Sequence, residues 1–551
     1  MKDLKPMLFS SMKSYSKEKL IKDIIAGIIV AIIALPLSIA LALASGVGPK
    51  EGIYTAIVAG FIISFLGGST VQIAGPTAAF ATIVAGIVDK NEMEGLVVAT
   101  VLAGIFLVLM GVFKLGSLIK YIPYTITTGF TAGIAVTILI GQLKDFFGIT
   151  YLGGEKPIEA VEKLKVFFEY IGTINIDAVI VGAVSLAILI VWPFISKKIP
   201  GSLIAVIVGS LLALKLDVPT IGSSFKLTSE LPKFSLPSFN LSLVKNVLPD
   251  AFTIAILAAI ESLLSCVVAD GMTNTKHRSN AELVAQGVGN MGSALFGGIP
   301  ATGAIARTAA NIKNGGSSPI AGMIHAVVLL LVLVFLMPYA SYIPMPTIAA
   351  ILFVVAYNMC QWRPFVRLCK TAPKSDIAVL VITFVLTVVF DLVIAIEVGF
   401  VLACLLFMKR MSDETGVVSW KYAEQDTDDS EKLRALPKEI RVYEITGPLF
   451  FGAADALAKI STKDFTKCLI VRMRSVPAID VTAMNALEEV YNKCEEKGIK
   501  LIFSHVNEQP MRVMEKAGFV KKVGRQSYCD HIESAIVLAK QSIAQVGGDQ
   551  Q

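Results

Sequence analysis

Charge is scarce in this 551-residue sequence: only 17% of the residues are Asp, Glu, Lys or Arg, while 54% are apolar. Soluble domains have about a quarter of their residues charged. The mean hydropathy is +0.70. This scarcity excludes an ordinary soluble globular protein and predicts a chain that is mostly surrounded by lipid.

Cysteine and histidine are also few, and their spacing does not suit a metal centre. The seven cysteines follow no CxxC or Cys/His pattern and there are only four histidines. We therefore expect neither a bound metal nor structural disulfides, and no cofactor. The net charge of +6 is spread over short loops, which argues against nucleic acid as a partner. The first apolar run is too long for a secretory leader.

Long uncharged runs are what the sequence has instead. A membrane-spanning helix needs about 20 apolar residues, and reading these runs predicts twelve spans. Two further segments, 76–88 and 303–313, are too short to cross alone and are expected to be half-helices, which brings the count to fourteen. The twelve spans are near 22–45, 51–67, 93–113, 118–141, 176–196, 200–216, 247–270, 281–297, 318–337, 345–358, 374–390 and 392–408.

Basic loops set the expected orientation. The first 22 residues hold six Lys against two acidic residues, and Lys/Arg-rich loops stay on the cytoplasmic side. We expect a multi-pass protein of the cell (inner) membrane with both termini in the cytoplasm, residues 1–21 forming a cytoplasmic segment and 22–410 a transport domain. The longer connections 144–175 and 217–246 then lie outside.

Two landmarks recur in the same order along the chain. Phe65-Leu66-Gly67-Gly68 precedes the first half-helix and Leu295-Phe296-Gly297-Gly298 the second; Tyr121-Ile122-Pro123 and Tyr342-Ile343-Pro344 open later spans. Because seven crossings per copy is an odd number, the second copy has the opposite orientation in the membrane. The sequence therefore predicts a seven-plus-seven inverted repeat, as in many secondary transporters.

The composition changes abruptly after residue 410. An acid-rich linker, 411–438, leads to a soluble domain at 439–545. There, β-type runs at 440–445, 468–473 and 500–505 alternate with helical patterns at 453–460, 482–497 and 509–517. Such alternation predicts a small parallel sheet with crossover helices.

The breaks before the half-helices point to a binding site. Unsatisfied backbone at membrane depth is tolerated only where it lines a cavity or is buried in protein. The first half-helix opens in Gln72-Ile73-Ala74-Gly75-Pro76-Thr77 and the second in Pro300-Ala301-Thr302-Gly303-Ala304. If these amino ends face each other, their N–H groups and positive dipole ends converge and attract an anion. The alternative is that the glycine-rich breaks only allow close helix packing.

Arg307 favours the anion site. It lies one turn into the second half-helix, where an Arg costs about 2.5–3.5 kcal/mol on insertion scales and needs a partner or a ligand. Glu261, in an otherwise uncharged helix, is its candidate ion-pair partner, and we expect it to balance Arg307 in the empty site or to take up a proton. Ser265, one turn further on, belongs to the same coupling group.

Several motifs resemble the SulP family, the solute carrier family 26 anion transporters, over essentially the whole chain. They are Ala34-Leu35-Pro36-Leu37-Ser38, Gly48-Pro49 with Gly52-Ile53-Tyr54, Ala74-Gly75-Pro76-Thr77 and Asn280-Ala281-Glu282-Leu283-Val284-Ala285-Gln286-Gly287. In that family the tail is a STAS domain, which residues 439–540 resemble. The resemblance implies core and gate domains, elevator-like alternating access and homodimers.

The resemblance also implies site residues and a substrate. Thr77 and the backbone at Gly303, Ala304 and Ile305 would line the anion site, with Arg307 beside them. Because Arg307 occupies the place where bicarbonate members bind sodium, we expect no sodium coupling and favour proton coupling. The segments 270–277 and 304–311 are similar to DauA-type members, which implies C4-dicarboxylates such as succinate, with sulfate or bicarbonate as alternatives, and contact of the tail with acyl carrier protein.

In the tail, Thr482 corresponds to the hydroxyl that related STAS proteins phosphorylate, although Ala483 replaces the usual glycine; the alternative is that Thr482 caps a helix. Other functions stay open on this scaffold. A channel or voltage-responsive motor, a tethered regulatory module with vestigial transport, and a nucleobase symporter share the fold. An Arg beside the site suits an anion better than a neutral base, and we expect a transporter and not an enzyme.

Overall fold

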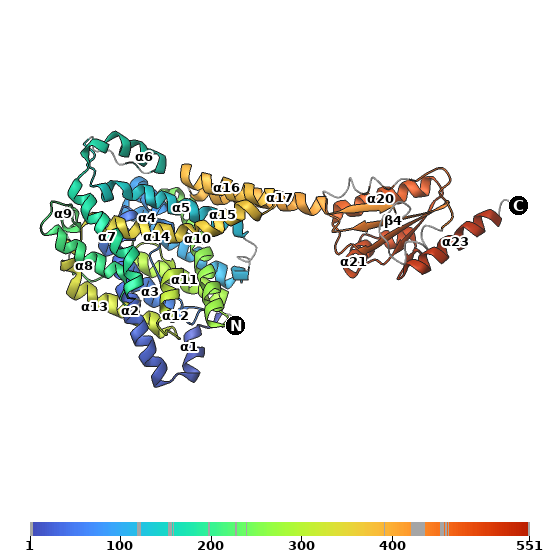
Figure 1. Ribbon diagram of the computed structural model, residues 1–551. Coiled ribbons are helices and arrows are strands. Elements are labelled where there is room, and N and C mark those ends of the chain that lie inside the picture. Colours follow the sequence, from blue (N-terminus) through green and yellow to red (C-terminus); the bar gives the residue numbers. More distant parts are fainter. Residues whose placement is uncertain are drawn as a thin grey trace. The chain divides into compact units, whose positions relative to one another are not determined.

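The computed structural model contains two compact units, Met1–Phe400 and Val401–Gln551, which are described separately (Figure 1). It describes all residues except 1–3, 118–122, 153–156, 158, 197–198, 226, 228, 238–239, 391, 420–435, 452–456, 458–459, 461 and 549–551. Three sequence predictions therefore fall largely outside the described residues: the Tyr121-Ile122 landmark, most of the linker, and the helix expected at 453–460.

The first half of the membrane unit follows the predicted order. The first half-helix continues into the following span as one helix, α4 (Ala81–Val112), and a backbone break at Glu92 (φ 56°, ψ −170°) divides α4 into two segments. The elements are α1 (Met7–Ser11), η2 (Met12–Ser14), α2 (Lys17–Ala44), α3 (Pro49–Leu66), β1 (Ala74–Gly75), η3 (Ala78–Phe80), α4 (Ala81–Val112), α5 (Tyr124–Phe147), α6 (Ala160–Glu169), η5 (Ile171–Thr173), α7 (Ile176–Ile195), α8 (Gly201–Ala213) and α9 (Ile221–Ser224).

The second half repeats this plan. The two short strands β1 and β2 occupy matching places, each ahead of a half-helix. The elements are α10 (Leu241–Thr273), α11 (Ser279–Leu295), β2 (Thr302–Gly303), α12 (Ile305–Lys313), α13 (Ile320–Leu336), η6 (Met337–Tyr342), α14 (Met345–Cys360), α15 (Trp362–Thr371), α16 (Lys374–Val389) and α17 (Leu392–Asp413).

The described residues confirm the fourteen-segment membrane fold. Seven segments (α2, α3, η3 with 81–91, 93–112, α5, α7, α8) are followed by seven (α10, α11, α12, α13, α14, α16, α17). Among the described residues, eight helical stretches are long and apolar enough to cross a bilayer by themselves. The sequence missed α6 and α15, two amphipathic helices in the connections after α5 and α14, because neither is long enough to be a span.

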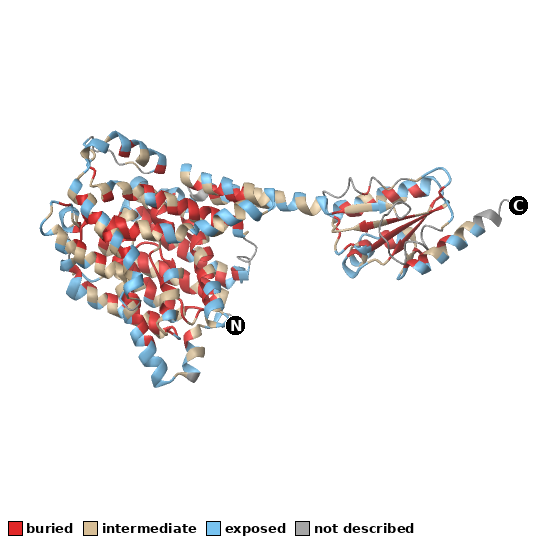
Figure 2. Cartoon of the chain, in the orientation of Figure 1, coloured by how far each residue is buried: buried red, intermediate tan, exposed pale blue. Residues whose placement is uncertain are grey.

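Close helix contact in the membrane unit depends on small residues. A Cβ on Gly287 of α11 would lie 2.5 Å from the Gly104 carbonyl oxygen and 2.8 Å from the Val108 nitrogen, both on α4. Only a residue without Cβ allows these backbones to meet, which is how helices associate in lipid. Figure 2 shows the result as a continuous region of buried residues across the helices.

The second unit is a five-stranded sheet with helices on both faces. The strand order is β3-β4-β5-β6-β7; β3 runs antiparallel to β4 and the other neighbours are parallel. This confirms the predicted parallel sheet, whereas the predicted linker contains an edge strand of its own. The elements are β3 (Gly416–Ser419), β4 (Ile440–Thr446), β5 (Cys468–Ser475), α20 (Val481–Glu496), β6 (Lys500–Ser504), α21 (Glu508–Lys516), α22 (Phe519–Val523), η9 (Arg525–Ser527), β7 (Tyr528–Cys529) and α23 (Ile532–Gly548).

Replacing Gly287 by Ala tests the helix contact. The added methyl group must push α11 away from α4, and overpacking of this kind costs about 1–3 kcal/mol. We expect Gly287→Ala to lower the melting temperature of the detergent-solubilised protein by several degrees. Gly271→Ala on α10 is the matched control, because a Cβ there meets nothing within 4 Å. Equal melting temperatures for the two variants would contradict the packing described.

Candidate functional site

The two interrupted segments meet through a pair of two-residue strands. β1 and β2 are antiparallel, with Ala74 opposite Gly303 and Gly75 opposite Thr302. The Ala304 amide also donates to the Ile73 carbonyl at 2.8 Å. These bonds satisfy backbone groups that would otherwise be unpaired inside the membrane, and they fix the start of each half-helix next to the other.

The first half-helix begins at Thr77. This residue has extended φ/ψ (−130°, 158°) and leads into η3, but its side chain makes no capping bond. Its hydroxyl Oγ1 donates instead to Glu261 Oε2 on α10, at 3.0 Å. The first N–H groups of the segment, which a capping side chain normally satisfies, are therefore not bound by Thr77.

The second half-helix begins after Ala304. An alanine has no side-chain acceptor, so α12 starts without a side-chain cap. Ala304 and Ile305 are half-exposed, whereas Gly303 directly before them is buried. Two uncapped helix starts thus lie on either side of the β1–β2 pair, and both have a partly accessible surface.

Arg307 is buried beside this pair, with only 3% of its surface exposed. Its Nη2 donates to the carbonyl of Pro76. Its Nη1 has no hydrogen-bond partner among the described residues and lies against Gly75, where a Cβ would collide with it. Gly75 is therefore needed for the guanidinium to reach the start of the first half-helix.

The ion pair between Arg307 and Glu261 that the sequence suggested is not formed. Within the described part of the chain, no carboxylate lies within 4.0 Å of the guanidinium. The backbone breaks explain this, because the Pro76 carbonyl and the Thr77 hydroxyl each take one of the two charged groups. Arg307 and Glu261 thus contact adjacent residues of one segment without touching each other.

Ser265 lies one layer behind the opening. It is fully buried, and its Oγ is 3.3 Å from Thr308 Oγ1, which in turn accepts a bond from the Ile73 amide at 3.1 Å. Ser262, which sequence reasoning missed, does similar work: its Oγ is 2.6 Å from Thr302 Oγ1 and accepts from the Gly303 amide at 3.1 Å. Both serines hold the β1–β2 pair in place.

Further polar groups surround the pair. Among the described residues, buried side-chain atoms without a hydrogen-bond partner include Gln72 Nε2, Asn311 Oδ1, Ser64 Oγ and both ring nitrogens of His325. Buried polar atoms usually have partners, so each such group needs an explanation. Their concentration on α3, α12, α13 and the strand region gives this interior a polar lining that is unusual in a membrane domain.

Comparison with known proteins identifies the family. The model of the Sulfate permease family matches residues 20–383, and that of the STAS domain matches residues 435–535. The chain belongs to the Sulfate permease family. The predicted SulP membership and the carboxyl-terminal STAS domain are thereby confirmed.

The chain is similar to named relatives and to solved structures. It is 40% identical over 95% of its length to "Putative sulfate transporter YvdB" of Bacillus subtilis (99% of that protein), and 31% identical over 91% of each chain to "Bicarbonate transporter BicA" of Picosynechococcus. The murine solute carrier 26 member A9 anion transporter shares the fold, with a TM-score of 0.88 at 19% identity over 98% of this chain and 94% of that one. The BicA transmembrane domain has a TM-score of 0.61 at 28% identity, over 69% and 98%.

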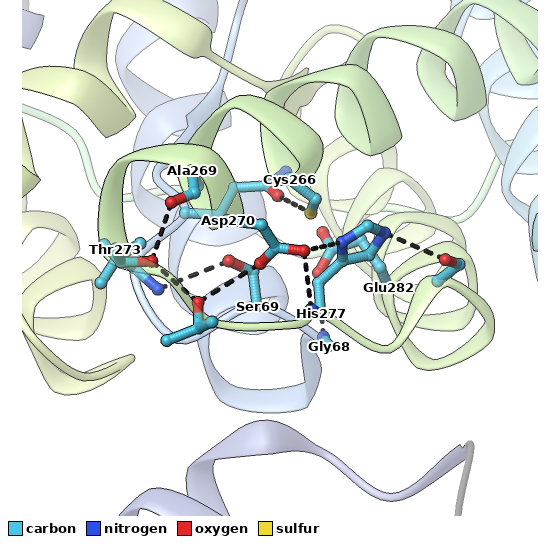
Figure 3. A network of polar contacts seen from close by, with 12 residues as sticks. Gly68, Ser69, Cys266, Ala269, Asp270, Thr273, His277 and Glu282 are labelled. Carbon is cyan, nitrogen blue, oxygen red and sulfur yellow. Dashed lines mark hydrogen bonds and ion pairs between the residues drawn. The ribbon is translucent and has the colours of Figure 1, made fainter. Parts of the chain in front are cut away.

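A second polar network of the protein lies at the end of α10 and the start of α11 (Figure 3). Asp270 Oδ2 accepts from the His277 amide at 3.0 Å and is 2.7 Å from its Nδ1, and His277 Nε2 is 3.0 Å from Ser279 Oγ. Glu282 accepts from the Gly68 amide at 2.9 Å. These contacts close the α10–α11 turn against the end of α3, and Glu282 also accepts a bond from Gln286 Nε2 at 2.8 Å.

In the STAS domain, Thr482 is the second residue of α20. The helix is capped by Asp480, whose Oδ1 accepts from the Ala483 amide at 2.8 Å, so Thr482 is not the cap. Thr482 lines a cavity of about 350 Å³ together with Asn485, Glu489 and the Cys494 region. Burial raises the pKa of the Cys494 thiol to about 11, so this cysteine is not a ready nucleophile.

The structure brings the predicted Thr77, Glu261 and 303–307 stretch close together. The sequence missed most of the residues that support them. Asn290 is an example: its side chain both donates to and accepts from the Ala301 backbone, at 2.9 and 2.8 Å. The signal that could have predicted this role from the sequence is an Asn with small neighbours within a membrane helix.

Replacing Asn290 by Ala tests this support. The change leaves the buried amide and carbonyl of Ala301 unpaired, at a cost of about 1–3 kcal/mol for each unsatisfied group. We expect Asn290→Ala to lower the melting temperature clearly more than Asn314→Ala, since the Asn314 side chain donates to the carbonyl of Ala310 in the adjacent last turn of α12 and does not reach another element among the described residues. If the two variants have the same melting temperature, the hydrogen bonds of Asn290 do not stabilise the strand region.

Proposed function

We propose that the membrane unit carries a small oxyanion across the bilayer by alternating access, and that it binds the anion between the starts of η3 and α12. The observation that carries this proposal is Arg307: a buried guanidinium whose Nη1 has no hydrogen-bond partner among the residues that the structure describes, next to two helix starts without side-chain caps. Thr77, Gly303, Ala304 and Ile305 line the proposed site.

Electrostatics supports an anion at this place. Each helix start contributes a positive partial charge of roughly half an elementary charge, and Arg307 adds a full one. Glu261, bonded to Thr77, offsets part of this charge in the empty site. A bound oxyanion would accept hydrogen bonds from the free N–H groups and so replace part of the hydration that it loses on entering.

The substrate we favour is an inorganic oxyanion, sulfate or bicarbonate, because the relatives that are 40% and 31% identical to this chain carry these names. The C4-dicarboxylate predicted from the motifs at 270–277 and 304–311 stays a prediction and is one arm of the test. Movement of the core helices against the gate helices, as in an elevator, would expose the site to each side in turn.

Other parts of the proposal concern the surroundings of the site. We place the protein in the inner cell membrane with both termini cytoplasmic, as the distribution of Lys and Arg suggests, and as a homodimer. The domain limits are 1–21, 22–410, 411–438 and 439–545. The STAS domain would be the regulatory part, with Thr482 as a modification site and acyl carrier protein as a partner.

Removing Arg307 is the direct test of the site. A hydrogen bond to a charged group contributes about 1.5–3 kcal/mol, so we expect Arg307→Ala to weaken saturable uptake of labelled sulfate into proteoliposomes by about 10- to 100-fold. Arg307→Lys should be intermediate, since it keeps the charge but loses the two-armed geometry. Bicarbonate and succinate, tested in the same assay, decide the substrate.

The matched control for this test is Lys313→Ala, which removes an exposed cation from the last turn of the same helix. Its uptake should equal that of the unmodified protein. Normal uptake by Arg307→Ala would mean that the proposed site is in the wrong place. Uptake that neither saturates nor shows counterflow would favour a channel.

Glu261→Gln tests proton coupling. Glutamine still accepts the Thr77 hydrogen bond but cannot take up a proton, so we expect anion counterflow to persist while uptake driven by an inward proton gradient is lost. The measurement compares both modes with and without a protonophore, and with a sodium gradient. Gradient-driven uptake that survives in Glu261→Gln, or that follows sodium instead, would exclude this role.

A further inference from the structure

Helix α15 (Trp362–Thr371) joins two membrane-spanning helices and has two chemically different sides. Gln361, in the left-handed region (φ 44°, ψ 45°), ends α14 and turns the chain into α15, and Pro373 opens α16 directly afterwards. Because both flanking helices cross the bilayer, this ten-residue helix is held at the membrane surface. Figure 1 shows it among the helices of the membrane unit, near α5.

One side of α15 packs on the protein. Phe365, Leu368 and Cys369 are half-buried, and the Phe365 ring lies 5.4 Å from that of Phe384 on α16. α15 also contacts α5. The helix is therefore attached to α5, α14 and α16, and a force on it acts on these three helices.

The opposite side is basic. Arg363, Arg367 and Lys370 follow at helical spacing, lie within one face, and are all exposed. α15 contains no acidic residue, and among the described residues none of the three cations forms an ion pair. We call these three residues the α15 basic face.

Aromatic residues mark the depth of the helix. Trp362 is 46% exposed at the edge of the basic face, and its Nε1 donates to the hydroxyl of the exposed Tyr357 at 3.1 Å. The Arg363 guanidinium lies 5.5 Å from the Trp362 ring centroid. Trp and Tyr concentrate at the level of lipid headgroups, where a helix with this composition lies in the interface.

The internal repeat provides a comparison. α6 occupies the equivalent connection in the first half, between α5 and α7, and its charges are mixed: Glu162, Lys163, Lys165 and Glu169. The repeat is inverted, so α6 and α15 lie at opposite membrane surfaces. Only the one expected on the cytoplasmic side is purely basic.

From these observations we infer that the α15 basic face binds the anionic headgroups of the phospholipids next to it, and that this contact acts on α5, α14 and α16 during transport. The partner is the lipid phosphate of the adjacent leaflet, selected by charge and by the aromatic edge at Trp362. This goes beyond the proposed anion site and does not depend on it.

Tryptophan fluorescence measures the lipid contact without requiring transport. The chain has three tryptophans, so W192F/W420F leaves Trp362 as the reporter. The full-length variant is reconstituted in phosphatidylcholine with a quarter of phosphatidylglycerol. Two samples are compared: in one the phosphatidylglycerol carries bromine at a shallow acyl position, and in the other the phosphatidylcholine does. With equal amounts of brominated lipid, brominated phosphatidylglycerol should quench Trp362 more strongly, because each surface cation favours anionic lipid by about fivefold.

In the same background, R363Q/R367Q/K370Q should bring the ratio of quenching by brominated phosphatidylglycerol to quenching by brominated phosphatidylcholine close to one. Glutamine keeps the helix propensity but removes the charge. The control K493Q/K516Q/K521Q removes three exposed cations from the STAS domain and should keep the preference. High salt should weaken it as well. Anion uptake by the unmodified protein should rise with the fraction of phosphatidylglycerol, and that rise should be lost in R363Q/R367Q/K370Q.

Equal quenching by both brominated lipids in the unmodified basic face would overturn the inference. So would a preference that millimolar inorganic phosphate abolishes at constant ionic strength, because the face would then be a site for free phosphate. A lipid preference without any effect on uptake would contradict the part of the inference that links lipid binding to transport. Since the quenching is measured without substrate, its result is separate from the success or failure of the proposed anion site.

Discussion

The transport domain depends on one small interaction, the antiparallel pairing of Ala74-Gly75 with Thr302-Gly303. Lipid offers no hydrogen bonds, so two chains can be non-helical at this depth only if they satisfy each other. This pairing brings residues from the two halves of the repeat, more than 200 positions apart, into one place. It also leaves two helix starts without side-chain caps, which is the property that an anion site needs.

The rest of the membrane unit supports this pairing. Ser262 bonds the backbone of strand β2, and Thr308 and Asn290 bond the backbone directly before β1 and β2. Gly75 leaves room for the Arg307 guanidinium. The polar residues are buried in a domain whose helices otherwise meet through small apolar residues. Their common task is to hold the backbone of the break rigid, so that any bound anion meets fixed donors and not mobile side chains.

Much of this fold follows from sequence because its signals are long or repeated. Uncharged runs give the spans, and the recurring Gly-Gly landmarks give the inverted repeat. The sequence pointed to Arg307 because placing a charged side chain in an apolar membrane segment is unfavourable in free energy. The separation of Arg307 from Glu261 could not be predicted, since it depends on which backbone carbonyl each side chain meets. Likewise β3 lay hidden in an acid-rich stretch, and α6 and α15 were too short to be read as spans.

The most direct test of the account is the position of a bound oxyanion in an experimental structure. Selenate, a heavy analogue of sulfate, can be located by its anomalous scattering in crystals of the protein. The account predicts one strong peak between Thr77 and Ile305, within hydrogen-bond reach of the free amides at the two helix starts. A peak elsewhere in the membrane unit, with this position empty in a protein that transports sulfate, would contradict it.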